Sequence, residues 1–304
     1  MTTESAPETG AVRAPRVLVG YDGSPAAAEA ITVGASLLPA ATAWIAYLWS
    51  PPFTSPELFA HLRRRARNLD ELLELVEAEG GAEAQRLVAT GIAVARATGW
   101  TAESIVRRTL GGEGFEMAAL AEELEADLIL VGSRGLGGTQ ALLGSVSDIV
   151  VHYATSPVLV APCPLATTAY DALATGPIVV GWDGSPGARV ALAAAADLFP
   201  DRELIVVGVG LPDDEDTPRP ADTYAARASY VRLPLIDRAG YTRAVAEQLD
   251  DLADERVAAA VVVGSRGRGA IPELLLGSLA KATLHRVRRP VLVAPKPRRL
   301  ATSP

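Results

Sequence analysis

The chain has 304 residues, of which 49% are hydrophobic and 21% charged, and its formal net charge is −8. This length suits two domains of about 150 residues each, and the apolar content is that of a globular protein. The negative balance argues against a general nucleic-acid binder, which needs a basic surface. No run reaches the roughly 20 apolar residues of a membrane span, and the first residues lack the pattern of a signal peptide.

One cysteine, Cys163, excludes an intramolecular disulfide and fits a reducing compartment. We therefore expect a cytoplasmic protein with no nucleic-acid and no membrane partner. Residues 1–14 are predicted to be a disordered leader, and residues 298–304 a tail.

The first predicted element is a buried strand, because residues 17–20 are a short apolar run. Asp-Gly-Ser-Pro follows and predicts a helix that Ser24 caps, with Pro25 in its first turn. A long amphipathic stretch lies within residues 56–97, and its basic run at 63–67 is interpreted as a solvated helix face rather than a nucleic-acid patch. The remaining predicted strands are 43–49, 101–108, 127–132 and 157–161, and the remaining helices are 113–125 and 145–154.

The same order of elements returns from residue 178. Asp183 repeats Asp22 at an offset of 161, and Gly264 repeats Gly132 at an offset of 132, so the second copy lacks 29 residues. Most of them belong to the long amphipathic stretch of the first copy. Strands are predicted at 178–181, 203–209, 259–264 and 290–294, with a weaker one at 228–235 and a helix at 241–252.

Strands that alternate with helices predict an α/β fold with parallel sheets and helices on both faces. The chain is therefore expected to hold two tandem doubly wound, Rossmann-like domains, each with five strands. We place the first at residues 15–163, a linker at 164–176, and the second, shortened after its second strand, at 177–297.

Three recurring features are expected at the carboxyl edge of each sheet, where open α/β sheets bind ligands. They are the Asp after strand one, a Gly-Ser-Arg-Gly loop after strand four, and the Gly-Ser that opens the next helix. The glycines at 132, 135, 264 and 267 are expected to allow positive φ and a close approach to a ligand. The helix start favours a phosphate, and Arg266 and Arg268 can reach its oxygens.

Each feature alone is more often structural, because Gly-Ser-Arg-Gly can be a turn and Gly-Ser a helix cap. Asp-Gly-Ser-Pro can likewise be a capped turn. Their joint occurrence, twice, favours a nucleotide pocket. Neither copy has a Walker loop, and the glycine run follows the fourth strand, which argues against a dinucleotide fold.

From about Arg16 to Lys296 the chain resembles the universal stress protein family in its tandem form. The ATP-binding members of that family carry G-x₂-G-x₉-G-[ST] after the fourth strand, and the second copy matches this motif in full. The resemblance implies that the nucleotide contacts Asp183, Val209, Gly264, Arg266, Gly267, Gly277, Ser278 and Leu279. The like positions of the first copy are Asp22, Gly132, Arg134, Gly135, Gly144, Ser145 and Val146.

The first copy departs from this motif. Only eight residues separate Gly135 from Gly144, and Leu136 stands where the second copy has Arg268. The second copy lacks most of the segment that helps to wall the pocket in the family. We expect the second site to be the better ATP site. The resemblance also implies that the last strands pair the two halves into a pseudo-dimer, and two chains could pair further into a homodimer.

The function that the resemblance implies is binding of ATP, ADP or AMP, with or without Mg²⁺, in a regulatory role in stress tolerance or growth arrest. We expect no enzyme, although slow ATP hydrolysis is allowed, because His61, His152 and His285 show no arrangement of a catalytic base. One alternative is a nucleotide-free structural or interaction module of the same fold. Another is an enzyme like the adenine-nucleotide α-hydrolases, but their S-G-G-x-D-S loop is absent.

Overall fold

The computed structural model describes residues 13–50, 56–133, 143–210, 227–234, 241–267 and 276–295. The elements of the first half are β1 (Arg16–Gly20), α1 (Pro25–Leu37), β2 (Thr42–Trp49), α2 (Pro56–Arg65), α3 (Leu69–Ala97), β3 (Thr101–Arg108), α4 (Glu113–Glu123), β4 (Leu128–Gly132), α5 (Ser145–Tyr153) and β5 (Val158–Ala161). Those that follow are α6 (Thr167–Ala172), β6 (Ile178–Gly181), α7 (Pro186–Leu198), β7 (Leu204–Val209), β8 (Ala228–Leu233), α8 (Tyr241–Glu255), β9 (Ala260–Gly264), α9 (Ser278–Arg286) and β10 (Val291–Ala294).

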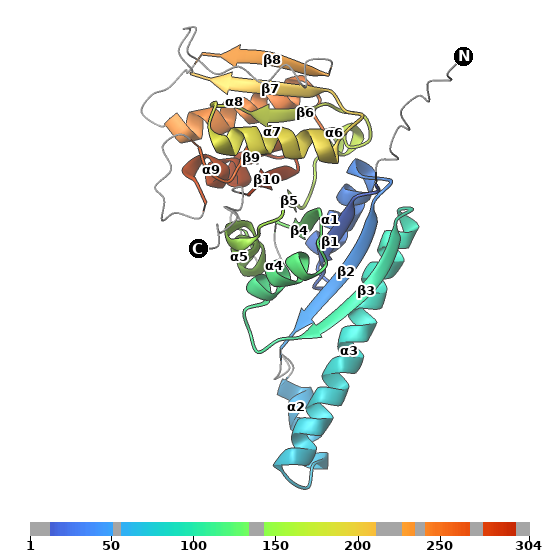
Figure 1. Ribbon diagram of the computed structural model, residues 1–304. Helices are drawn as coiled ribbons and strands as arrows, with labels where there is room; N and C mark the ends of the chain where they lie inside the picture. The colour runs from blue at the N-terminus through green and yellow to red at the C-terminus, as the bar shows by residue number, and fades with distance from the viewer. Residues whose placement is uncertain are drawn as a thin grey trace, which may run out of the picture.

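The strands form one continuous sheet in the order β3-β2-β1-β4-β5-β10-β9-β6-β7-β8 (Figure 1). Each half contributes five parallel strands, and the second half repeats the order of the first in mirror sequence along the sheet. This confirms the predicted α/β class and the tandem arrangement. The weaker predicted strand at 228–235 is present as β8.

Both Asp-Gly-Ser-Pro segments fold as the capped turns that the sequence predicts. The Ser24 hydroxyl accepts a hydrogen bond from the Ala27 amide at 3.1 Å, and Ser185 does the same for Ala188 at 3.1 Å. Gly23 and Gly184 take φ of +80° and +76°, which an L-residue rarely adopts. This turn lets the chain leave a buried strand and enter a helix at once.

Two hydrophobic layers cover the sheet, one on each face. The face of α1, α3 and α7 buries alternate strand residues such as Val19, Leu130 and Val180. The face of α4, α5, α8 and α9 buries the intervening ones, such as Ile129 and Val179. The central strands are covered on both faces and are continuous apolar runs, as expected of parallel sheets, whereas the edge strands β3 and β8 include polar residues.

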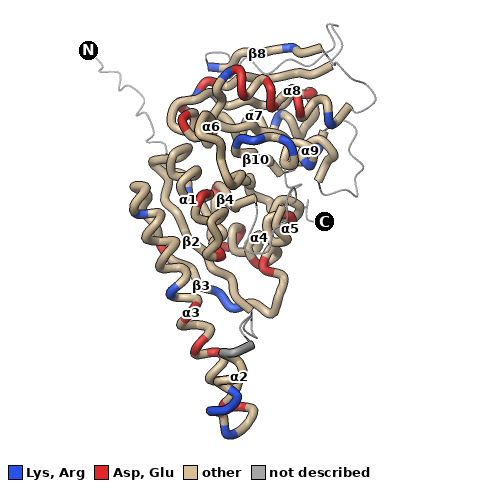
Figure 2. The backbone as a smooth tube through the Cα atoms, turned by 180° about the vertical axis from the view of Figure 1, so that it is seen from behind, with Lys and Arg blue, Asp and Glu red and all other residues tan. Residues whose placement is uncertain are grey.

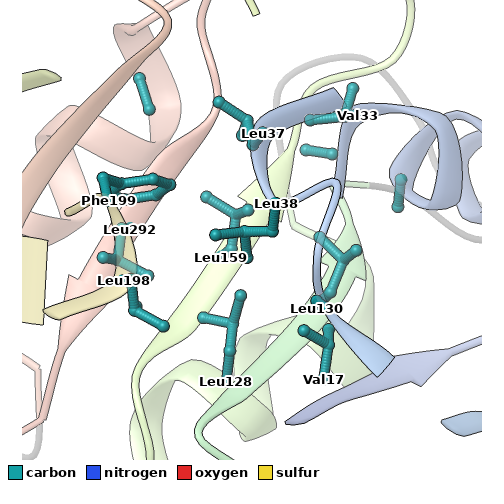
Figure 3. Packing of buried hydrophobic residues seen from close by; sticks show 14 of the residues in the cluster. Val17, Val33, Leu37, Leu38, Leu128, Leu130, Leu159, Leu198, Phe199 and Leu292 are labelled. Atoms are coloured by element: carbon teal, nitrogen blue, oxygen red, sulfur yellow. The ribbon is translucent and has the colours of Figure 1, made fainter. Parts of the chain in front are cut away.

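The halves join where β5 pairs antiparallel with β10. Leu159 stands opposite Leu292 at the centre of this pair. Leu38, Leu198 and Phe199, from the ends of α1 and α7, close over it in one shared layer (Figure 3). This confirms that the last strands pair the two halves, and it places a pseudo-two-fold axis between Leu159 and Leu292.

The long amphipathic stretch of the first half forms two helices, α2 and α3. The chain breaks after Arg65, and Asn68 caps α3 by accepting from the Glu71 amide at 2.8 Å. Together α2 and the start of α3 form an arm that extends past the carboxyl ends of β2 and β3 (Figure 1). The basic residues Arg63, Arg64 and Arg65 are exposed at its far end, as expected of a solvated helix face (Figure 2).

The second half has a different crossover at this point. Ala102 of β3 is level with Ala228 of β8, an offset of 126, so 35 residues are missing between strands two and three. Between its third and fourth strands the second half has six residues more than the first, which raises the offset to 132. The second half is therefore shorter at this crossover than the net difference of 29 suggests. No helix in the described part of the chain is both long and apolar enough to cross a membrane.

The predicted linker contains the short helix α6, which was not predicted from the sequence. Arg202 holds the end of this helix, because its guanidinium donates to the carbonyl oxygens of Leu173 at 2.8 Å and Gly176 at 3.2 Å. Burial lowers the pKa of Arg202 from its ordinary value. The linker is thus fastened to the second half.

We predict that Leu292→Ala lowers the free energy of unfolding by about 2–5 kcal/mol, because it leaves a cavity at the centre of the junction between the halves. Urea denaturation followed by circular dichroism measures this. The matched control is Leu69→Ala, at a leucine that is 68% exposed, which should change stability by less than about 0.5 kcal/mol. Equal effects of the two variants would contradict the assignment of the junction as core.

Candidate functional site

The structure brings the three recurring features of each half to one edge of the sheet. β1 runs beside β4 with Val19 opposite Leu130, so the turn at Asp22 and the loop after Gly132 leave the sheet together. In the second half β6 runs beside β9 with Val180 opposite Val262, which joins Asp183 to the loop after Gly264 in the same way. The strand order changes direction between these strands, which is where open α/β sheets bind ligands.

The aspartates at this edge help to form the turns that carry them. Oδ1 of Asp183 accepts a hydrogen bond from the Ser185 amide at 2.9 Å, and Oδ1 of Asp22 accepts one from Ser24 at 2.9 Å. A Cβ atom at Gly267 would lie only 2.8 Å from Oδ2 of Asp183. Gly267 therefore allows the loop to come directly against this carboxylate.

The glycines that end the fourth strands serve for close packing rather than for positive φ. Gly132, Gly264 and Gly267 are not among the residues with positive φ, so that part of the prediction is wrong for them. A Cβ atom at Gly264 would stand 2.6 Å from the Gly187 carbonyl, and one at Gly132 would stand 2.6 Å from that of Ala26. In each half the first helix sits directly against the fourth strand.

Both glycine loops close with the same hydrogen bond. The Gly277 amide donates to the Ser265 carbonyl at 2.6 Å, and the Gly144 amide donates to the Ser133 carbonyl at 3.0 Å. The one-residue contraction of the first loop therefore leaves its two ends in the same arrangement. Arg134, Gly135 and Arg268 lie outside the described residues.

Helices α5 and α9 begin at the closing point of these loops. Their N-cap residues are Gly144 and Gly277, which have no side chain to accept from the first amides of the helix. Those amides and the positive end of the helix dipole favour an anion at Ser145 and Ser278. The following residues, Val146 and Leu279, are half-buried against the helical layer.

The backbone of Arg266 lies between the turn that follows Asp183 and the start of α9, since Cβ atoms at Gly187 and at Gly277 would both meet it. The Arg266 side chain is half-buried, and its Nε is buried without a hydrogen-bond partner in the ranges that the structure describes. A buried donor without an acceptor is costly. An anion bound at the start of α9 would supply such an acceptor, so the residues present fit a phosphate group.

Val209 ends β7 beside this site. Gly181, the last residue of β6, stands opposite Val207, so Val209 is level with Asp183 beyond the end of β6. The Val209 side chain is buried in the layer of α8 and α9. It can form part of an apolar wall next to the aspartate.

The residues around the first site differ from those around the second, and this difference was not predicted from the sequence. Tyr47 of β2 lies near three carboxylates, and its pKa is raised by burial and by the charges of Glu83, Asp22 and Glu113. Glu113, the first residue of α4, accepts a hydrogen bond from the Ser50 hydroxyl at 3.1 Å. Three carboxylates therefore act on Tyr47 at the strand-end edge of the first half.

Helix α3 also covers the Asp22 turn. A Cβ atom at Gly23 would approach Leu87 at 3.1 Å, and one at Gly91 would approach the Tyr21 ring at 2.9 Å. The second half has no helix in this place among its described residues. Helix α3 thus forms a wall beside the Asp22 turn of the first site, and no described helix does so beside the Asp183 turn of the second.

Two further side chains stand at the start of α9. The Thr242 hydroxyl, near the start of α8, is 3.4 Å from that of Ser278. Lys281 lies in the first turn of α9 and is exposed. A position-by-position comparison of the copies would have found both, because Leu110 and Asp148 stand at the corresponding positions.

The described side chains do not gather into a cluster of three or more His, Cys, Asp or Glu that could hold a metal ion. The ring Nδ1 of His152 contacts the Asp148 carbonyl oxygen of its own helix at 2.7 Å. The Nδ1 atom of His152 is therefore occupied by a contact within the last turns of α5.

Comparison with known proteins gives one family. The model of the universal stress protein family matches residues 14–162 and 175–295. A universal stress protein of Mycobacterium tuberculosis is 35% identical over 189 residues, which cover 56% of this chain and 62% of that protein. The chain thus matches less than two thirds of the length of such relatives. Another from the same organism is 29% identical over 305 residues, covering 91% and 94%.

Solved structures agree with the fold. The crystal structure of a universal stress protein from Archaeoglobus fulgidus aligns with a TM-score of 0.63 and 19% identity, and the alignment covers 94% of this chain and 97% of that one. At this level of identity the likeness shows the arrangement of both halves.

We predict that Gly264→Ala destabilises the protein by about 1–3 kcal/mol, since its methyl group would overlap the backbone of Gly187. Thermal and urea unfolding measure the change. Gly81→Ala is the control, because nothing lies within 4 Å of a Cβ at this position in α3 and the change should be neutral or stabilising. A neutral Gly264→Ala would contradict the close helix–strand contact.

A second prediction concerns Tyr47. Glu83→Gln removes a negative charge that raises the pKa of the Tyr47 phenol, so that pKa should fall toward its ordinary value of 10.0. A pH titration of ¹³C-tyrosine NMR signals measures it, with Glu255→Gln in the second half as the control. An unchanged titration of Tyr47 would show that Glu83 does not act on it.

Proposed function

Because the chain belongs to the universal stress protein family, we propose that it binds ATP, ADP or AMP at the carboxyl edge of its second half. The observation that carries this proposal is the closed loop between Ser265 and Gly277, which sets Gly267 against Asp183 and starts α9 at Ser278. It joins a carboxylate, a close glycine backbone and a helix amino terminus in one place.

Each part of the nucleotide would meet a suitable group. The Asp183 carboxylate can accept from a ribose hydroxyl or an adenine amino group, and Val209 offers an apolar contact for the base. The amides at the start of α9 and the guanidinium of Arg266 favour the phosphates. A bound ATP would bring negative charge to this edge, and Mg²⁺ could accompany the phosphates.

The first half is proposed as a second nucleotide site. Its Asp22 turn and its closed loop between Ser133 and Gly144 repeat the geometry of the second half. Helix α3 adds a wall beside Gly23. The two sites would give a maximum of two ligands per chain.

We propose a regulatory role rather than catalysis. The groups at the second edge fit binding of a nucleotide. In the first half, His152 is a candidate base by its chemistry, but its ring contacts the backbone of its own helix. The ligand would act by favouring one conformation or one protein partner, in the cytoplasm, in stress tolerance or growth arrest. Steady release of phosphate or pyrophosphate from ATP at an enzymatic rate would contradict this role.

The direct test is isothermal titration of the chain, stripped of nucleotide, with ATP in the presence and absence of Mg²⁺. Two equivalents per chain would support two sites, and one would support a binding half and a structural half. No binding at millimolar ATP, checked by equilibrium dialysis, would overturn the proposal in favour of a ligand-free interaction module.

We predict that Gly277→Ala combined with Ser278→Ala weakens ATP binding at the second site by more than about tenfold, or about 1.4 kcal/mol. The added methyl group would press on the Ser265 carbonyl at 3.1 Å, and the serine hydroxyl would be lost. Titration calorimetry measures the affinity and the number of sites. Gly144→Ala with Ser145→Ala is the matched variant in the first half. If both double variants bind like the parent protein, the loops do not hold phosphate.

A further inference from the structure

The two candidate sites carry opposite charges at equivalent positions of the phosphate-binding helix. Lys281 lies three residues after Ser278 in α9, and Asp148 lies three residues after Ser145 in α5. Residues three apart are neighbours on one helix face, and helical side chains lean toward the amino terminus. Lys281 and Asp148 therefore take equivalent positions in the first turn of their helices, close to the serine at which a phosphate would bind. The Asp148 carboxylate is also 3.6 Å from the Nδ1 atom of His152 in the same helix.

Two further carboxylates distinguish the described part of the first edge. Glu113 begins α4 in the first half, and the matching position of the second half holds the buried Val245. Glu83 adds a further negative charge near Tyr47, whose position is taken by Gly208 in the second half. Asp22 has its counterpart in Asp183, and Arg107 and Arg108 at the end of β3 are paired with other carboxylates, those of Glu116, Glu123 and Glu77. The carboxylates that the described part of the first edge adds are therefore those of Glu113 and Glu83.

The second edge also offers one more hydroxyl. Helix α8 begins at Tyr241, whereas α4 begins only at Glu113, four positions later in the alignment of the copies. This extra turn brings Thr242 to within 3.4 Å of the Ser278 hydroxyl. Among the residues that the structure describes, the positive groups nearby are Arg266 and Lys281, while Arg243 and Arg286 are both paired with Glu247.

We propose that the two halves divide their ligands by charge. The second half takes a polyphosphate nucleotide, ADP or ATP, with Lys281 and Thr242 as additional phosphate-contacting residues. The first half takes a nucleoside or a nucleoside monophosphate, because Asp148 and Glu113 repel further phosphates. This division rests on the proposed nucleotide function.

The test titrates the full chain with adenosine, AMP, ADP and ATP in separate experiments. The loop variants in each half assign each binding event to its site. The second half should bind ATP at least about tenfold more tightly than adenosine, and the first half should show the reverse order. Equal preference of the two halves for ATP would overturn the division but would leave the proposed function intact. No binding of any of the four compounds would overturn both.

Charge reversals make the test specific. Lys281→Asp should weaken ATP at the second site by about tenfold or more and leave adenosine binding within about twofold. Asp148→Lys should strengthen ATP at the first site by about tenfold. Arg256→Asp is the matched control, because Arg256 is exposed after α8 at the opposite edge of the sheet and undergoes the same change of charge. If Lys281→Asp and Arg256→Asp have the same effect, Lys281 does not contact phosphate.

Discussion

The antiparallel pairing of β5 with β10 is the contact on which the rest of the molecule depends. Each half alone would expose the last strand of a sheet, a row of unpaired amides and carbonyls that promotes aggregation. Pairing Leu159 with Leu292 satisfies both edges at once. It also merges the layers of α1 and α7 into one core over the junction. The ten strands of the two halves thereby form one continuous sheet.

Much of the fold could be predicted because duplication repeats each local signal. The capped Asp-Gly-Ser-Pro turns and the buried strands follow from short-range chemistry, and the structure confirms them. The break between α2 and α3 was missed, since Asn68 caps a helix inside one continuous amphipathic pattern. Helix α6 was missed because its hold by Arg202 is a tertiary contact.

The site was harder to predict than the fold, because its residues depend on contacts between distant segments. The glycine pattern marked the right loops, but the packing of Gly264 on Gly187 appears only when helix and strand are placed together. Tyr47, Glu83 and Glu113 come from three elements and carry no shared motif. The divergence of the copies, with α3 in one and a short crossover in the other, left each edge with its own chemistry.

The direction of the strands sets how the two sites can influence each other. Because β10 runs antiparallel to β5, the strands of the two halves point in opposite directions. The carboxyl edges of the two halves therefore lie at opposite strand-end edges of the sheet. Two bound ligands would therefore not touch, and a partner seated on one would leave the other accessible. Among the described residues, the sites are linked only through the buried layers that both halves share on the two faces of the central strands, one of which includes Leu38 and Phe199 (Figure 3).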